Sequence, residues 1–252
     1  MSDPTAPFAS DGVPGPDGRR IGVLLSHGFT GSPASIRPWA EHLAEQGYAV
    51  RVPLLPGHGT TWQEMNRTGW ADWSTAIEAT YADLAARCDA VVVGGLSMGG
   101  TLALWLASRH PEIAGVVVVN PAVTSTNKQL LALPLLKHVV PSMPGLANDV
   151  KKPGVVEHGY DRTPLRALAS LVDAWKRLRP DLPAITAPLL MFRSAEDHVV
   201  DPSSARMILQ RVSSRDAREL LLPDSYHVAT LDNDAPTIFA ESATFVERVT
   251  AP

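Results

Sequence analysis

The stretch Ala90-Val91-Val92-Val93-Gly94-Gly95-Leu96-Ser97-Met98-Gly99-Gly100 decides the fold class of this chain. A short run of valines, typical of a buried strand, leads directly into the pattern Gly-x-Ser-x-Gly, and a stretch of helical period follows it. In this position the pattern predicts a sharp turn between strand and helix that exposes the serine hydroxyl at the end of a sheet. Because a serine hydroxyl is a weak nucleophile without a base and hydrogen-bond donors beside it, we expect Ser97 to be the nucleophile and the neighbouring loops to assist it.

Short apolar runs alternate with longer stretches of helical period on both sides of this turn. The expected strands are 21–26, 48–53, 90–94, 115–119, 188–193 and 218–222. The expected helices are 33–46, 68–87, 98–109, 202–211 and 235–249. This alternation predicts an α/β fold with a mostly parallel central sheet and helices on both of its faces.

One connection is far longer than a single crossover helix requires. We expect residues 121–186 to form a cap, or lid, inserted between two strands of the sheet. The first half of this cap is rich in leucine and valine and is interrupted by prolines, which predicts a lid over an apolar pocket; the alternative is that these side chains complete the core. The first 20 residues, rich in proline and glycine, predict a surface arm with one short edge strand near Phe8. The whole chain, 1–252, is expected to be a single α/β domain.

The composition excludes several classes of protein. Of the 252 residues 45% are hydrophobic and 19% are charged, which is enough to bury one sizeable core. The net charge of −4 lacks the basic excess that nucleic acids attract, so we expect no nucleic-acid partner. The single cysteine, Cys88, excludes an intrachain disulfide and is expected to be a packed, unreactive thiol. The sequence has no motif for a metal, a phosphate loop or a dinucleotide, so we expect no cofactor and no metal.

The sequence also indicates where the protein acts. The N-terminal residues lack the basic and apolar segments of a secretory signal, and no run approaches the roughly 20 apolar residues of a membrane span. We therefore expect a cytoplasmic protein. Transient contact of the apolar lid with membranes or lipid aggregates is compatible with this location.

A nucleophilic turn of this kind predicts that an acid and then a histidine follow in the chain, each in a loop after a later strand. The loop after the expected strand 188–193 carries Asp197, which we interpret as the acid, with Glu196 and Asp201 as the alternatives. The loop after the expected strand 218–222 carries His227, the expected base. A catalytic triad of Ser97, Asp197 and His227 is therefore predicted.

An oxyanion hole needs two backbone N–H groups directed at the developing charge. One comes from the residue after the nucleophile, Met98, and the other from the loop after the first expected strand, where Phe29 is the natural donor. We expect His27, just before that donor, to be a buried orienting residue. His58 belongs to Pro56-Gly57-His58-Gly59, which we interpret as a structural turn.

Five segments in one order resemble the α/β-hydrolase superfamily, and within it the small bacterial carboxylesterases and monoacylglycerol lipases. The resemblance covers nearly the whole chain and is carried by residues 27–33, 56–60, 95–101, 196–200 and 225–232. It implies a serine esterase that cleaves carboxylic esters of small lipids through an acyl-enzyme. A broad-specificity carboxylesterase, and a thioesterase or acyltransferase that uses the same triad, are the alternatives; a non-catalytic binding protein on the same fold is a more distant one.

Residues 148–160 of the cap resemble the bacterial monoacylglycerol lipases more than the general esterases. The resemblance implies that Glu157 holds the glycerol hydroxyls, since a carboxylate accepts hydrogen bonds from two adjacent hydroxyls; the alternative is a solvated surface glutamate. Asn120, at the end of the expected strand 115–119, is expected either to touch substrate or to cap the turn before Pro121. The function predicted is a monoacylglycerol lipase that releases glycerol and a fatty acid.

Overall fold

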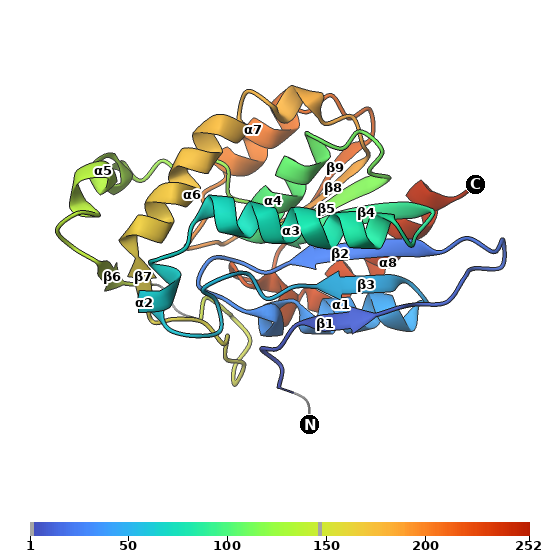
Figure 1. Ribbon diagram of the computed structural model, residues 1–252, viewed down its shortest axis with the longest axis horizontal. Helices are drawn as coiled ribbons and strands as arrows, with labels where there is room; N and C mark the ends of the chain where they lie inside the picture. Colours follow the sequence, from blue (N-terminus) through green and yellow to red (C-terminus); the bar gives the residue numbers. More distant parts are fainter. Residues whose placement is uncertain (1–2, 146–147) are drawn as a thin grey trace.

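The computed structural model describes residues 3–145 and 148–252, and within these residues it shows a seven-stranded sheet between two layers of helices (Figure 1). In spatial order the strands are β1 (Phe8–Ser10), β3 (Ala49–Val52), β2 (Ile21–Ser26), β4 (Ala90–Leu96), β5 (Gly115–Val119), β8 (Leu189–Ser194) and β9 (Ala217–Leu222). β1 pairs antiparallel with β3 at one edge, and all the other pairs are parallel. The predicted α/β fold with a mostly parallel sheet is confirmed.

The register of the central strands brings their carboxyl ends to one edge of the sheet. Ser26 pairs with Gly95, Leu96 pairs with Val119, and Ser194 at the end of β8 pairs with Leu222. β2, β4 and β5 are buried along almost their whole length, because helices cover both faces and leave no face for polar side chains. Every loop that follows one of these strands therefore opens at the same edge.

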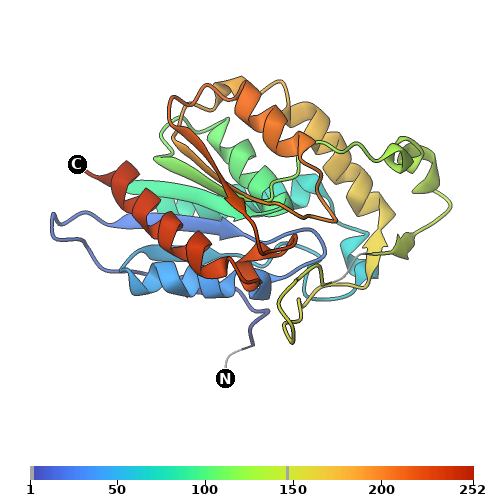
Figure 2. The same ribbon diagram turned by 180° about the vertical axis from the view of Figure 1, so that it is seen from behind.

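Two hydrophobic clusters hold the helices on the two faces of the sheet. One face packs against α3 (Trp70–Ala85), α4 (Met98–Ala107), α6 (Leu165–Leu178) and α7 (Ser203–Arg211). The other face packs against α1 (Arg37–Glu45) and α8 (Ala235–Thr250), which also contact each other (Figure 2). α4 is buried on nearly every side because it lies between the sheet and α3 and α6.

The N-terminal part of the chain differs from the prediction in two helices that were expected and in one that was not. The helix expected over 33–46 is divided into η1 (Pro33–Ser35) and α1, because Pro38 at the start of α1 favours a new helix start there. The helix expected over 68–87 starts at Trp70, where the Asp72 carboxylate accepts the Gly69 N–H at 2.9 Å. A short helix, α2 (Trp62–Met65), precedes it.

The cap lies between β5 and β8 and has its own small elements. These are η2 (Lys128–Leu131), α5 (Leu133–Leu136), the antiparallel pair β6 (Ser142–Pro144) and β7 (Arg162–Pro164), α6, and η3 (Leu182–Ala184). α6 packs against α3 and α4, whereas η2 and α5 project away from the body (Figures 1 and 2). Asn66, just after α2, holds the base of this projection, since its amide donates to Pro141 O at 3.1 Å and accepts the Arg166 N–H at 2.9 Å.

No helix within the described part of the chain is long and apolar enough to cross a membrane.

Candidate active site

Ser97 sits at the turn between β4 and α4 in a strained backbone conformation. Its φ of +55° and ψ of −114° lie outside the region that most residues adopt. The turn is possible only with glycines beside it: a Cβ at Gly99 would lie 1.9 Å from Ser26 O, and one at Gly95 would lie 2.5 Å from the Gly99 carbonyl carbon. The Ser97 N–H donates to Val119 O at 2.9 Å, which fixes the turn against β5. The geometry is that of a nucleophile elbow.

Asp197 and His227 form a hydrogen-bonded pair beside this turn. The His227 Nδ1 lies 2.8 Å from the Asp197 Oδ2, and both side chains are less than a tenth exposed. The other carboxylate oxygen of Asp197 accepts the N–H groups of Val199 and Val200 at 2.8 Å each. These two bonds fix the carboxylate, which in turn orients the imidazole so that Nδ1 carries the proton and Nε2 is the acceptor.

The two alternative acids have other partners. The Glu196 carboxylate lies 3.5 Å from the Nε2 of His198 and is mostly exposed. The Asp201 carboxylate accepts hydrogen bonds from Thr126 and from the Ser203 N–H at the start of α7. Asp197 is thus the one of the three expected candidates that the structure places against His227.

The pKa values of the two partners are shifted in opposite directions: that of His227 is raised and that of Asp197 is lowered. Burial lowers the pKa of His227, but the charge of Asp197 and the hydrogen bond to it outweigh burial and raise this pKa above its usual value. Burial raises the pKa of Asp197, but the His227 charge and the hydrogen bonds from His227 and the two valine N–H groups outweigh it, so this pKa lies below its usual value. Each partner therefore stabilises the charged form of the other.

Asn120 connects the ends of the strands that carry the pair. Its amide oxygen accepts the Ser194 N–H at 2.8 Å, and its amide nitrogen donates to Ser194 Oγ at 3.0 Å and to His227 O at 2.8 Å. Because Asn120 directly follows Val119, whose carbonyl accepts the Ser97 N–H, these contacts connect the turn of Ser97 to the loop of His227. The buried side chain of Asn120 is directed at protein groups, and its expected contact with substrate stays a prediction.

The two expected oxyanion donors belong to segments that lie directly beside Ser97. A Cβ at Gly28 would lie 3.5 Å from the Cβ of Ser97, so the loop that carries Phe29 runs directly past the serine. Within residues 3–145 and 148–252, the N–H groups of Phe29 and Met98 donate to no protein acceptor. The Phe29 ring packs edge-on against Trp73, with 5.9 Å between centroids, which holds the loop in place.

His27 and His58 support the same loop from below. The Nδ1 of His27 bonds to Gly28 O at 3.0 Å, and its Nε2 accepts the Leu55 N–H at 3.2 Å. Burial lowers the pKa of His27 to about 4, and burial together with the neighbouring His27 lowers that of His58 to about 3. Both rings are neutral near pH 7 and pack 4.9 Å apart, which agrees with structural roles.

Glu157 lies where the cap meets residues 27–31, the loop that carries the expected donor Phe29 and is called the oxyanion loop below. A Cβ at Gly31 would lie 3.3 Å from the Glu157 Oε1, and the Glu157 N–H donates to the Asn148 side chain at 2.6 Å. Burial is the main reason why the pKa of Glu157 is raised, and the charge of His227 opposes this shift. The carboxylate is therefore partly buried and within electrostatic range of His227.

Two cap residues with contacts at the site were given no role by the sequence. Tyr160 donates its N–H to Thr30 O at 3.1 Å, and its hydroxyl donates to Gly57 O and accepts the Thr60 N–H, both at 2.8 Å. Asp149 is a buried carboxylate that contacts His227 and His198. Both lie in the segment whose resemblance to lipases was noted, which was the only signal for them.

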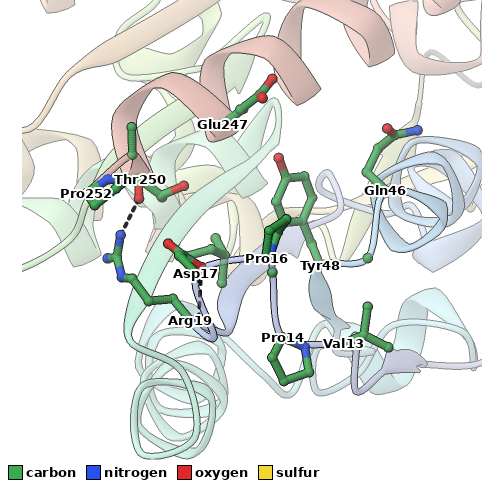
Figure 3. A pocket seen from close by; sticks show the side chains of 14 residues that line it. Val13, Pro14, Pro16, Asp17, Arg19, Gln46, Tyr48, Glu247, Thr250 and Pro252 are labelled. Atoms are coloured by element: carbon green, nitrogen blue, oxygen red, sulfur yellow. Dashed lines mark hydrogen bonds between the residues drawn. The ribbon is translucent and has the colours of Figure 1, made fainter.

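Other parts of the molecule do not contribute to this site. A cavity of about 610 Å³ lies at the other end of the strands, near the starts of β2 and β3, between the N-terminal arm and the end of α8. Tyr48 and Glu247 are among its lining residues (Figure 3). None of the residues that line it belongs to the loops of Ser97, Asp197 or His227. Among the described residues no group of three or more His, Cys, Asp or Glu side chains is arranged to hold a metal.

A serine on a strained turn between strand and helix, together with a histidine–aspartate pair from two later loops, is the arrangement of a serine hydrolase of the α/β-hydrolase class. The chain belongs to the Hydrolase_4 family, described as "Serine aminopeptidase, S33", whose model matches residues 18–234.

Named relatives narrow the class to enzymes that act on esters. The chain is 42% identical over 233 residues to a thermostable monoacylglycerol lipase from Bacillus sp. (strain H-257), covering 90% of this chain and 91% of that protein. It is 28% identical over 236 residues to a carboxylesterase from Bacillus subtilis (strain 168), covering 90% and 92%. Its structure matches that of a lipolytic enzyme from a study of the metagenome-derived LipS and LipT with a TM-score of 0.92 and 40% identity, over 97% of this chain and 98% of that one. The predicted family and the predicted class, a carboxylic ester hydrolase, are confirmed.

Proposed function

We propose that the protein is a monoacylglycerol lipase that releases glycerol and a fatty acid. The observation that supports this substrate is the position of Glu157, a partly buried carboxylate between the oxyanion loop and His227. A carboxylate there can accept hydrogen bonds from the two free hydroxyls of a glycerol whose third oxygen carries the ester. The 42% identity to a monoacylglycerol lipase supports the same choice.

In the proposed mechanism the Ser97 Oγ attacks the ester carbonyl while the Nε2 of His227 takes its proton. Asp197 holds the imidazole in the required tautomer and stabilises the imidazolium that forms. The N–H groups of Phe29 and Met98 bind the oxyanion of the tetrahedral intermediate. His227 then protonates the glycerol oxygen as it leaves, and a water molecule, deprotonated by His227, hydrolyses the acyl-Ser97 intermediate.

Glu157→Ala is expected to lower kcat/KM for a monoacylglycerol by about 10- to 100-fold and that for a short nitrophenyl ester by less than about threefold. The reason is that only the glycerol ester has hydroxyls for the carboxylate to bind. Parallel kinetics on the two substrates measure the difference. His158→Ala is the matched control: the Ser32 hydroxyl donates to the backbone oxygen of His158, and the substitution keeps that oxygen. Equal losses on the two substrates would show that Glu157 has no role in selectivity.

The activity is expected to fall as the pH falls through the pKa of His227, because only the neutral imidazole can accept the serine proton. This pKa is raised, so the acid limb of kcat/KM lies above pH 6.5, the usual value for histidine. The stability contribution of the charged pair has a different dependence. It is complete between the unfolded-state pKa values of Asp197 and His227, is lost as the pH rises through the raised folded-state pKa of His227, and is lost as the pH falls through the lowered folded-state pKa of Asp197. A profile of kcat/KM on a soluble ester from about pH 5 to about pH 9 measures the first effect. An acid limb below pH 6.5 would contradict the assignment.

We also propose that the cap contacts lipid surfaces transiently. Leu133 packs inward against Leu165 and Ala169, whereas Leu131, Leu135 and Val139 are each about 80% exposed on the projecting part of the cap. An apolar patch of this kind on a projecting segment is suited to a lipid surface.

Replacing both Leu131 and Leu135 with serine is expected to weaken partitioning onto lipid vesicles by roughly tenfold, because two exposed apolar side chains no longer enter the lipid. Hydrolysis of a soluble nitrophenyl ester is expected to stay unchanged. Val13→Ser, which alters an exposed apolar side chain beside the far cavity, is the control. Unchanged partitioning, or a smooth saturation curve as a monoacylglycerol passes from monomer to micelle, would contradict contact through the cap.

The proposed function is tested by rates of the wild-type protein and of Ser97→Ala on a monoacylglycerol, a diacylglycerol and a short nitrophenyl ester. We expect the wild type to prefer the monoacylglycerol and the variant to lose that activity. Equal rates on all three esters would favour a broad carboxylesterase, the second candidate, which the identity to the Bacillus subtilis enzyme supports. If none of the three is cleaved, the proposal is wrong and thioesters are the next substrates.

A further inference from the structure

Asp149 is a buried acidic residue that takes no part in the proposed mechanism. It lies in the cap between β6 and β7, and only 8% of it is exposed. One carboxylate oxygen accepts the backbone N–H groups of His227 at 3.1 Å and of His198 at 3.3 Å. The other oxygen lies 2.7 Å from the Nδ1 of His198. The Asp149 carbonyl also accepts the Val228 N–H at 3.0 Å.

These contacts join two loops whose paired residues, Asp197 and His227, lie 30 positions apart in the chain. His198 directly follows Asp197 in the loop after β8, and His227 lies in the loop after β9. The bond of 2.8 Å between Asp197 and His227 requires the two loops to keep a fixed separation. A single carboxylate that accepts hydrogen bonds from both loops fixes that separation from the side of the cap.

We propose that Asp149 is a positioning residue that holds the loops of Asp197 and His227 together and thereby makes the geometry of the triad depend on docking of the cap. The inference rests on the proposed function, because it assigns to Asp149 a role in the reaction of Ser97. Asp149 takes part in no step of the proposed mechanism, so this role is additional to it.

The neighbouring contacts show that this part of the cap is docked. The buried carboxylate of Asp232 accepts the N–H groups of Lys151 at 2.7 Å and Lys152 at 2.8 Å, and that of Tyr226 at 2.9 Å. The Lys151 ammonium also pairs with Asp224 at 2.9 Å. The segment that carries Asp149 therefore contacts the histidine loop, the loop after β9 with His227, at several points. Asp149 itself also binds the loop after β8 that carries Asp197.

The charge of Asp149 has an effect that is separable from its hydrogen bonds. Three ionisable groups face Asp149. They are the imidazole of His198, which also faces Glu196 and the Tyr226 ring, the imidazole of His227, which also faces Asp197, and the carboxylate of Glu157, which also faces His227. Negative charge beside His227 favours its imidazolium form. Loss of that charge alone therefore moves the ionisation of His227 to lower pH, whereas loss of the hydrogen bonds disturbs the geometry.

Two substitutions separate these effects. Asp149→Ala removes charge and hydrogen bonds, and we expect kcat on a soluble nitrophenyl ester to fall by about 10- to 100-fold with KM changed by less than about threefold. Asp149→Asn keeps an oxygen for the two backbone N–H groups, and we expect a loss below about fivefold with the acid limb of kcat/KM moved to lower pH. Asp234→Asn is the control: its carboxylate accepts the Asp224 N–H and the Ser225 hydroxyl in the histidine loop, away from His227, and we expect wild-type kcat.

The rate of labelling of Ser97 by a fluorophosphonate probe is measured on the same proteins, because it reports the competence of the triad without the natural substrate. Slower labelling of Asp149→Ala than of Asp234→Asn supports the inference. Wild-type labelling and kcat in Asp149→Ala would overturn it while leaving the proposed function intact. If Asp149→Ala does not fold, Asp149→Ser decides, because its shorter side chain cannot accept hydrogen bonds from both loops; wild-type labelling and kcat in that variant overturn the inference. Failure of the wild-type protein to react with the probe would instead overturn the proposed function.

Discussion

Ser97→Ala is expected to lower kcat for ester hydrolysis by about 10⁴- to 10⁶-fold. The loss is large because every covalent step passes through the Ser97 Oγ, so only the oxyanion donors and substrate binding remain to assist water. The variant keeps the turn, since alanine adds no atom beyond those that serine already places there. Steady-state kinetics on a soluble ester, with the melting temperature as the measure of folding, test this prediction.

Ser108→Ala is the control for Ser97→Ala. Ser108 ends the same helix, and its hydroxyl donates to Trp105 O at 2.8 Å, away from the site. It is expected to keep wild-type kcat. A Ser97→Ala protein that is folded and retains more than about a hundredth of the wild-type rate would show that another nucleophile carries the reaction.

Asp197→Asn is expected to lower kcat by about 10⁴-fold while leaving the fold in place. The amide oxygen of the new side chain accepts the N–H groups of Val199 and Val200, as the carboxylate oxygen does at 2.8 Å. The amide nitrogen then faces the Nδ1 of His227, which must give up its proton to accept a hydrogen bond. The proton moves to Nε2, so the imidazole can no longer take the proton of Ser97.

Asp201→Asn distinguishes the two aspartates of this loop. The Asp201 carboxylate bonds to Thr126 and Ser203, so its replacement affects the start of α7 and is expected to change kcat by less than about threefold. Kinetics of the two variants on the same soluble ester measure the contrast. A larger loss for Asp201→Asn than for Asp197→Asn would reverse the assignment of the acid.

The central strands were predictable because their signal is local. The expected strands 21–26 and 115–119 agree with β2 and β5, and the expected strand 218–222 differs from β9 by one residue. A run of buried β-branched residues needs no distant partner to be read as a strand. The elbow at Ser97 was predictable for the same reason, since the glycines that make room for it are its own neighbours in the chain.

The cap was less predictable because its structure depends on distant contacts. The sequence marked residues 121–186 as one insertion and assigned no helix within it, although α6 is a long amphipathic helix. The prolines and leucines around it obscured its period. η2 and α5 are short, and the inward position of Leu133 becomes visible only when α6 is in place beside it.

The supporting residues of the site were missed for a related reason. Asp149 contacts His198 and His227 across 49 and 78 positions of the chain, and Tyr160 contacts Gly57 across 103 positions. Neither residue lies in a strand-end loop, where catalytic side chains are sought. Asn120 was expected at the right edge of the sheet, but its contacts with Ser194 and His227 depend on the packing of three strands.

The measurement that tests the central claim most directly is stoichiometric labelling with a fluorophosphonate, followed by peptide mass spectrometry and by residual hydrolysis of a monoacylglycerol. The account predicts that the label is found on Ser97 and that activity is lost in proportion to the labelled fraction. Full activity in the labelled protein, or a label on another residue that accompanies the loss of activity, would contradict it.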